Sequence, residues 1–203
     1  AFAVMSSLSA CITNIVDEAG QDTGDTVGAE EGDGSGETNG NDSGSRYEEI
    51  TSEIRPIRDA LNETDPIDSA DFPDMGTTTY TGYMDANLHP GSGTGDDAAL
   101  GVMTVTAGWE DNSITGSVTD IIDGSDRDYV GSLEISNGVI GDRISAQITG
   151  TLENAASEAL VIDGTMSGDF FDNFTYAEGS FDGSVTSPSD TTEFAGGWIA
   201  SSE

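Results

Sequence analysis

The chain has no lysine, and its five arginines stand against 39 aspartate and glutamate residues in a total of 203. The formal net charge of -34 repels phosphate backbones and anionic lipid surfaces, which excludes nucleic-acid binding. Such a charge is best tolerated where salt screens it, so the composition indicates a saline or external environment. The apolar fraction of 34% is low for a chain that folds throughout, and we expect part of it to be unfolded.

A single cysteine, Cys11, excludes an internal disulfide and a cysteine-rich zinc site. Residues 1–10 are apolar and small, as at the end of a signal peptide, and Leu8-Ser9-Ala10-Cys11 resembles the bacterial lipobox. In proteins with that motif the signal is cut before the cysteine, which is then acylated. We therefore expect a signal remnant at 1–10, a lipid on Cys11 and a place on the outer membrane, at the bacterial cell surface. The alternative is an incidental thiol in a frayed terminus.

Residues 11–45 follow as a low-complexity segment, rich in acids and glycine and without a basic or aromatic side chain. Such a segment cannot bury enough apolar surface to offset its ordering entropy, which predicts a disordered acidic tether. Its aspartates lack the spacing of a calcium loop and are interpreted as solvated charge.

Residues 46–76 are predicted to be a short helix and a connector. Apolar residues recur at three- and four-residue steps between Arg46 and Glu63, the spacing of one helical face. Pro56 is expected to kink this helix or divide it into two. Because Arg46, Arg55 and Arg58 lie here, the helix either packs simply by its apolar face or is also held by charge against an acidic body.

From 77 to 203 the hydrophobic period becomes two, in runs separated by Gly, Asp, Asn and Ser. The connections are short enough only for antiparallel hairpins. Glycine and apolar residues share one face, as in Ala177, Gly179, Phe181, Gly183 and Val185. The predicted fold class is therefore all-β, an eight-stranded antiparallel up-and-down soluble β-barrel, with a two-sheet sandwich as the second architecture. A membrane-spanning barrel fits less well, because the polar face carries acids in mid-strand. The predicted strands are 77–88, 99–107, 113–121, 129–136, 144–152, 160–170, 175–186 and 192–200.

Several of these segments together resemble the barrel domain of the transferrin-binding-protein-B-like surface lipoproteins. The resemblance covers about residues 71 to 200 and implies a lipidated protein that binds host proteins, haem-carrying proteins or solutes. The chain departs from the large members in having one barrel and no visible handle domain. The segments that carry the resemblance are residues 71–83 (DFPDMGTTTYTGY), 100–107 (LGVMTVTA), 114–120 (ITGSVTD), 162–168 (IDGTMSG), 179–185 (GSFDGSV) and 194–198 (FAGGW).

An even number of strands returns both barrel termini to one end, where the connections 108–112, 137–143 and 171–174 lie. We expect the tether to join there and ligand to bind at the opposite end, since binding residues commonly lie on loops.

His89 is either a solvated turn residue or a haem ligand, and residues 123–128 form either a tight acidic turn or a calcium loop. Aromatic side chains near strand ends, at 109, 171, 174 and 198, either plug the barrel or form a protein-binding patch. The candidate ligand-binding residues are His89, Asp96, Asp97, Asp123, Asp126, Arg127 and Asp128.

The sequence offers little for catalysis, because its only histidine lies in a glycine-rich loop and Cys11 is assigned to the lipid. We expect a monomeric, non-catalytic cell-surface lipoprotein that binds a protein, haem-related or small solute ligand through barrel-end loops. We expect it to contact the membrane through its lipid anchor. We expect no resident cofactor; bound haem or bound calcium is the weaker alternative. Two other readings remain: an acidic structural coat lipoprotein without a ligand, and a transmembrane β-barrel.

Overall fold

The computed structural model describes residues 45–88 and 98–202. The signal remnant, Cys11, the predicted tether and the 89–97 connection lie outside the described residues. Within the described ranges, no helix is both long and apolar enough to cross a bilayer. The elements are helix α1 (Arg46–Leu61), a 3-10 turn η1 (Ser69–Asp71) and the strands β1 (Thr77–Asn87), β2 (Ala98–Gly108), β3 (Ser113–Asp123), β4 (Val130–Ile140), β5 (Ile144–Glu153), β6 (Ala159–Phe171), β7 (Tyr176–Thr186) and β8 (Thr191–Ser202).

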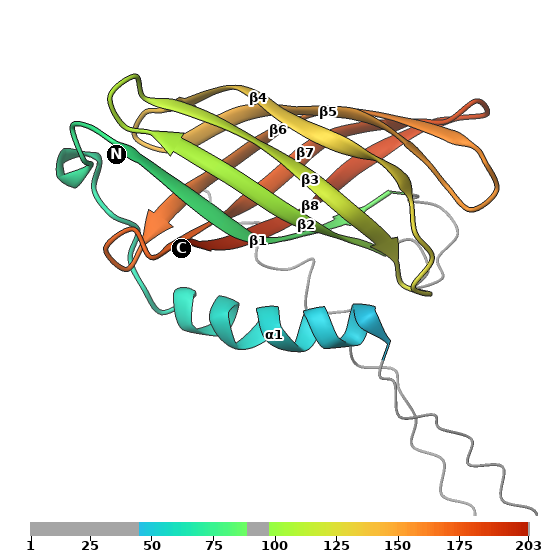
Figure 1. Cartoon of the computed structure of the whole chain (residues 1–203), viewed down its shortest axis with the longest axis horizontal. Coiled ribbons are helices and arrows are strands. Elements are labelled where there is room, and N and C mark those ends of the chain that lie inside the picture. Colours follow the sequence, from blue (N-terminus) through green and yellow to red (C-terminus); the bar gives the residue numbers. More distant parts are fainter. Residues whose placement is uncertain (1–44, 89–97, 203) are drawn as a thin grey trace, which may run out of the picture. The chain divides into compact units, whose positions relative to one another are not determined.

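The eight strands form one closed antiparallel barrel, in which each strand pairs with the next and β8 pairs with β1 (Figure 1). The closing register runs from Tyr80 opposite Ser202 to Asn87 opposite Ala195. The predicted barrel is confirmed, and the two-sheet sandwich is excluded. Closure leaves no strand edge unpaired, which removes the usual route to edge-to-edge aggregation.

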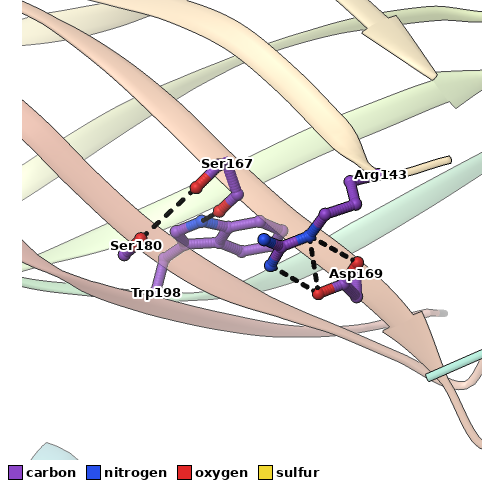
Figure 2. Close-up of polar contacts among 5 residues, drawn as sticks. All are labelled: Arg143, Ser167, Asp169, Ser180 and Trp198. Carbon is purple, nitrogen blue, oxygen red and sulfur yellow. Dashed lines mark hydrogen bonds and ion pairs between the residues drawn. The ribbon is translucent and has the colours of Figure 1, made fainter. Parts of the chain in front are cut away.

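Apolar side chains fill the barrel, and glycines make room for the largest of them. Gly168, Gly179 and Trp198 lie opposite one another on β6, β7 and β8. A Cβ atom added to Gly179 would meet the Ser167 carbonyl oxygen, and one added to Gly168 would meet the Trp198 ring. The indole Nε1 donates a hydrogen bond to the Ser167 carbonyl at 3.1 Å, as Figure 2 shows. Small and large residues therefore alternate because the Trp198 ring packs directly on the backbone of the neighbouring glycines.

A β-bulge in β3 changes which residues face outward. Asp120 has φ 49° and is the extra residue at the point where the register with β2 shifts. Val118 and Ile121 therefore both belong to the barrel core, while Ile122 turns outward into a second cluster. Strict period-two alternation would have placed Ile122 inside.

Helix α1 is a single helix through Pro56, and the predicted division into two helices is wrong. The proline is exposed, and the carbonyl that it leaves without a donor belongs to Ser52, which is exposed as well. Because water can satisfy that carbonyl, the cost of the missing hydrogen bond is small. The opposite face of the helix is buried against the outside of the barrel, where Ile54 and Leu61 join Leu100, Ile122, Phe171 and Ile199 in an outer cluster.

The chain enters at the barrel end opposite to the one predicted. We call the end with the connections 109–112, 141–143 and 172–175 the plug end, and the end with 124–129, 154–158 and 187–190 the Asp126 end. β1 does start at the plug end, but the backbone N–H groups of Arg46 and Tyr47 bind Asp126. The first residues of α1 are thus held at the Asp126 end, and the helix leads back to the plug end. The even-strand prediction for the start of β1 and the end of β8 is confirmed, but the inference about the tether is wrong because it left out a helix that runs along the outside of the barrel.

Candidate functional site

The predicted loop at residues 123–128 is a tight acidic turn organised by Asp123. This carboxylate is 5% exposed and is the one buried charged group among the described residues. Its Oδ1 accepts hydrogen bonds from the backbone N–H groups of Ser125 and Arg127, both at 2.9 Å, and its Oδ2 pairs with the Arg127 guanidinium at 2.6 Å. These bonds satisfy the carboxylate, as a buried charge requires. The turn therefore has a clear structural role.

Asp126 and Asp128 use this turn to hold the start of α1. The Asp126 carboxylate accepts hydrogen bonds from the N–H groups of Arg46 at 3.1 Å and Tyr47 at 2.8 Å. Ser45 caps the next N–H, that of Glu48, at 3.1 Å. Asp128 adds an exposed ion pair with Arg46 at 3.5 Å. The first N–H groups of a helix have no partner inside it, and here the Asp126 carboxylate accepts their hydrogen bonds. The helix dipole also favours a negative charge at the N-terminus of a helix.

The remaining candidates, His89, Asp96 and Asp97, lie outside the described residues. The four described candidates, at 123, 126, 127 and 128, do come together, and they contact each other and α1. Their observed partners are therefore parts of this same chain.

The plug end is closed by four aromatic rings. Phe72, which precedes β1, meets Phe170 at a centroid distance of 5.6 Å and an interplanar angle of 90°. Trp109 lies 5.0 Å from Phe170 and 5.2 Å from Phe174, and its indole N–H donates to the Thr78 hydroxyl at 2.9 Å. The predicted plug is therefore correct for Trp109 and Phe174. The other two aromatics serve elsewhere: Phe171 in the outer cluster and Trp198 inside the barrel.

The turn beside this plug is strained. Asp172, Asn173 and Phe174 have φ values of 46°, 53° and 64°, three left-handed residues in succession. This conformation costs an L-residue about 1–2 kcal/mol and is exceptional for an aromatic one. It places the Phe174 ring in the plug, so aromatic packing offsets the backbone cost.

The rim of the plug end carries an exposed methionine and a well-formed ion pair. Met75 is 75% exposed, next to Gly76, whose φ is +96°. Arg143 binds the Asp169 carboxylate through Nε at 2.9 Å and Nη2 at 2.6 Å, a bidentate pair that raises the pKa of the arginine (Figure 2). Ser69 donates to Asp142 at 3.2 Å, which links η1 to the turn after β4. This rim thus combines fixed loops with an exposed apolar side chain.

Charged groups between α1 and the barrel were not predicted as a site. Arg58 lies between Glu178 at 3.5 Å and Asp85 at 3.9 Å, and all three side chains are only partly exposed, by 19 to 33%. Burial raises the pKa of both carboxyl groups, and the arginine partly offsets this. Of the two interpretations of the helix, packing with additional charge pairing is the observed one.

Two tyrosines lie in the same contact between helix and barrel. Burial, with the neighbouring Asp85 charge, raises the pKa of Tyr47 to about 12. Burial and the Glu53 carboxylate raise the pKa of Tyr83, whose hydroxyl donates to Glu53 at 3.4 Å. The spacing of apolar residues predicted the helix, but it could not predict which carboxylates the helix meets. Asp85 and Glu178 come from β1 and β7, which are distant from α1 in the sequence.

In the part of the chain that the structure describes, no group of three or more His, Cys, Asp or Glu side chains is placed to hold a metal ion. Comparisons with known protein families, with curated proteins and with solved structures found no match to this chain.

Proposed function

We propose that this chain is a non-catalytic binding protein, anchored at a bacterial surface through Cys11, that binds a protein ligand at the plug end of its barrel. The observation that carries the proposal is the direction of α1. The helix starts at the Asp126 end, so the chain before it joins the described structure there, and the plug end is the end farther from that junction. Loops held on a rigid scaffold and directed outward are where binding residues commonly lie.

A protein ligand fits this barrel better than a solute held inside it. The interior positions carry large side chains with no exposed surface, among them Trp198, Tyr80, Phe194 and Met84. By contrast, the plug-end rim offers Met75, which is an apolar contact of the kind used in protein interfaces. The resemblance of residues 71–200 to transferrin-binding-protein-B-like lipoproteins supports the same class of function, including haem-carrying ligands.

The outer surface supports a barrel surrounded by water. Glu134, Asp163 and Asp182 are exposed in mid-strand, on the face that a membrane-spanning barrel would turn toward lipid. The principal competing function is an acidic coat without a ligand, favoured by the net charge of -34.

Thermal-shift measurements on the full chain would test the proposal, with haemin, haemoglobin and transferrin as probes. Because a ligand that binds only the folded state stabilises it, a binder gains melting temperature with its ligand. We expect the gain to disappear in Met75→Asp and to persist in Ser189→Asp, a matched change at an exposed residue of the Asp126 end. A gain lost only in Ser189→Asp would move the site to the other end. No gain with any probe would favour the coat function.

Mass spectrometry of the native N-terminus would test acylation of Cys11.

A further inference from the structure

The barrel and α1 are held by separate sets of contacts. We propose that α1 is a releasable strap that sets the barrel end from which the N-terminal segment departs. With α1 docked, the chain joins at the Asp126 end; with α1 released, it joins at the plug end while the barrel stays folded. This goes beyond the proposed function, since it concerns the protein without ligand.

The barrel is complete without the helix. Every strand is hydrogen-bonded on both sides by other strands, so α1 contributes nothing to the ladder. The barrel core, which includes Trp198 and Tyr80, contains no residue of α1. The outer cluster, which contains Ile54 and Leu61 of the helix, has no buried residue in common with it. Loss of the helix contacts therefore leaves both the ladder and the inner packing in place.

The helix is held by contacts that can be lost as a unit. Its apolar contribution centres on Ile54 and Leu61, and its charges meet the barrel through Arg46 and Arg58. A 16-residue helix with a proline inside it is marginal in water when it has no partner. Release would therefore also melt it, which makes docking and helix formation a single local equilibrium.

The connector after α1 stays fixed at the plug end when the helix is released. The N–H group of Ile67 donates to the Phe170 carbonyl at 2.8 Å, and the Phe72 ring lies in the plug. Both contacts are to the barrel and not to α1. The last fixed point of the chain therefore moves from the Asp126 end to the plug end, by the length of a 16-residue helix, about 24 Å.

For the anchored protein, the consequence rests on the proposed function: in the docked state the plug end is farther from the point where the N-terminal segment joins, and in the released state the Asp126 end is. The strap itself does not depend on the anchor or on a ligand, so it is tested separately from the proposed function.

Hydrogen exchange of the full chain tests the strap. Ile54→Asp and Arg58→Gln should accelerate exchange of the α1 amides at least ten-fold and leave the strand amides unchanged. Arg55→Gln is the matched control, because this arginine is exposed on the same helix and its loss changes the charge equally. It should exchange like the wild type. Equal acceleration of strand and helix amides in Ile54→Asp would overturn the proposal, as would unchanged α1 exchange in both variants.

A distance measurement tests the change of departure point. Spin labels on Glu48→Cys and Ser189→Cys, in a Cys11→Ser background, mark the start of α1 and a turn at the Asp126 end; both substituted positions are exposed. The docked chain should give one narrow distance distribution, and Ile54→Asp should give a broad one with longer distances. A narrow distribution in both proteins would overturn the strap and leave the binding proposal untouched.

Discussion

The barrel core and the outer cluster under α1 are both apolar, yet they are held in different ways. In the core, rings fit over glycine backbone on closed strands, and its members are uncharged. In the outer cluster, apolar side chains are flanked by Arg58 and its two carboxylates. Complementary shape therefore holds the barrel core together, whereas the outer cluster, which has fewer buried members, combines apolar packing with charge pairs. Disturbing the first should unfold the protein, and disturbing the second should release only the helix.

The largest effect is expected from Trp198→Ala. The indole is fully buried over Gly168 and Gly179, where the neighbouring glycines cannot fill the space that it leaves. We expect a loss of about 4 kcal/mol in the free energy of unfolding, seen as a lower denaturation midpoint for the whole barrel. A loss confined to α1, with the barrel midpoint unchanged, would contradict the separation of the two clusters.

Gly179→Ala tests the same fit from the backbone side. The new methyl group would meet the Ser167 carbonyl and the Gly168 backbone, which cannot move without opening the β6–β7 pair. We expect destabilisation of about 2–3 kcal/mol by chemical denaturation. The control is Gly141→Ala, whose methyl group would have only the Arg143 carbonyl nearby, at 3.9 Å. Equal midpoints for the two variants would rule out the close approach.

Ile54→Ala addresses the outer cluster. The side chain is 5% exposed, and its truncation removes apolar burial between helix and barrel. We expect docking of α1 to weaken by about 2 kcal/mol, read from hydrogen exchange of its amides, with little change in the strands. If the strands lost protection to the same extent, the helix would belong to the same cooperative unit as the barrel.

Asp126→Gly should weaken the start of the helix by about 1 kcal/mol, because two N–H groups lose their acceptor. Glycine suits this position, whose φ is 59°, so backbone strain does not confuse the result. Asp172→Gly removes the same charge at another left-handed residue, with φ 46°, in the plug-end turn. Hydrogen exchange of the first α1 amides should become faster in Asp126→Gly only. An equal increase in both variants would contradict the role of Asp126 as the acceptor for these amides.

The smallest effect concerns pH. Burial raises the folded-state pKa of Asp85 and Glu178, so docking takes up protons. The stabilising contribution is complete below the ordinary carboxyl pKa and is lost as pH rises through the folded-state values. Helix docking, followed by exchange corrected for its intrinsic pH dependence, should therefore be tightest at acid pH and weaken toward neutrality. A double Asp85→Asn, Glu178→Gln variant should lose this dependence, and persistence of the slope would assign it to other groups.

Most of the barrel could be predicted, because each strand carries its own alternation. The run from Ala177 to Val185 shows its inward face in sequence alone, and the described structure buries its large members. Outcomes that depend on distant partners could not be predicted. Asp126 was recognised as a loop acid, but its role follows from a helix start some eighty residues earlier in the chain. The Asp120 bulge likewise shows only through the register of β2 against β3.

By itself, the sequence determined the barrel: its strand count, its antiparallel pairing and the inward side of the strands whose alternation is unbroken. These follow from local alternation and short turns, which involve neighbouring residues only. The tertiary structure decided where α1 lies, which carboxylates Arg58 meets and from which end the chain enters. Those outcomes depend on surfaces that exist only after the barrel has closed, when Leu100, Ile122 and Ile199 from three strands form one apolar strip for the helix to cover.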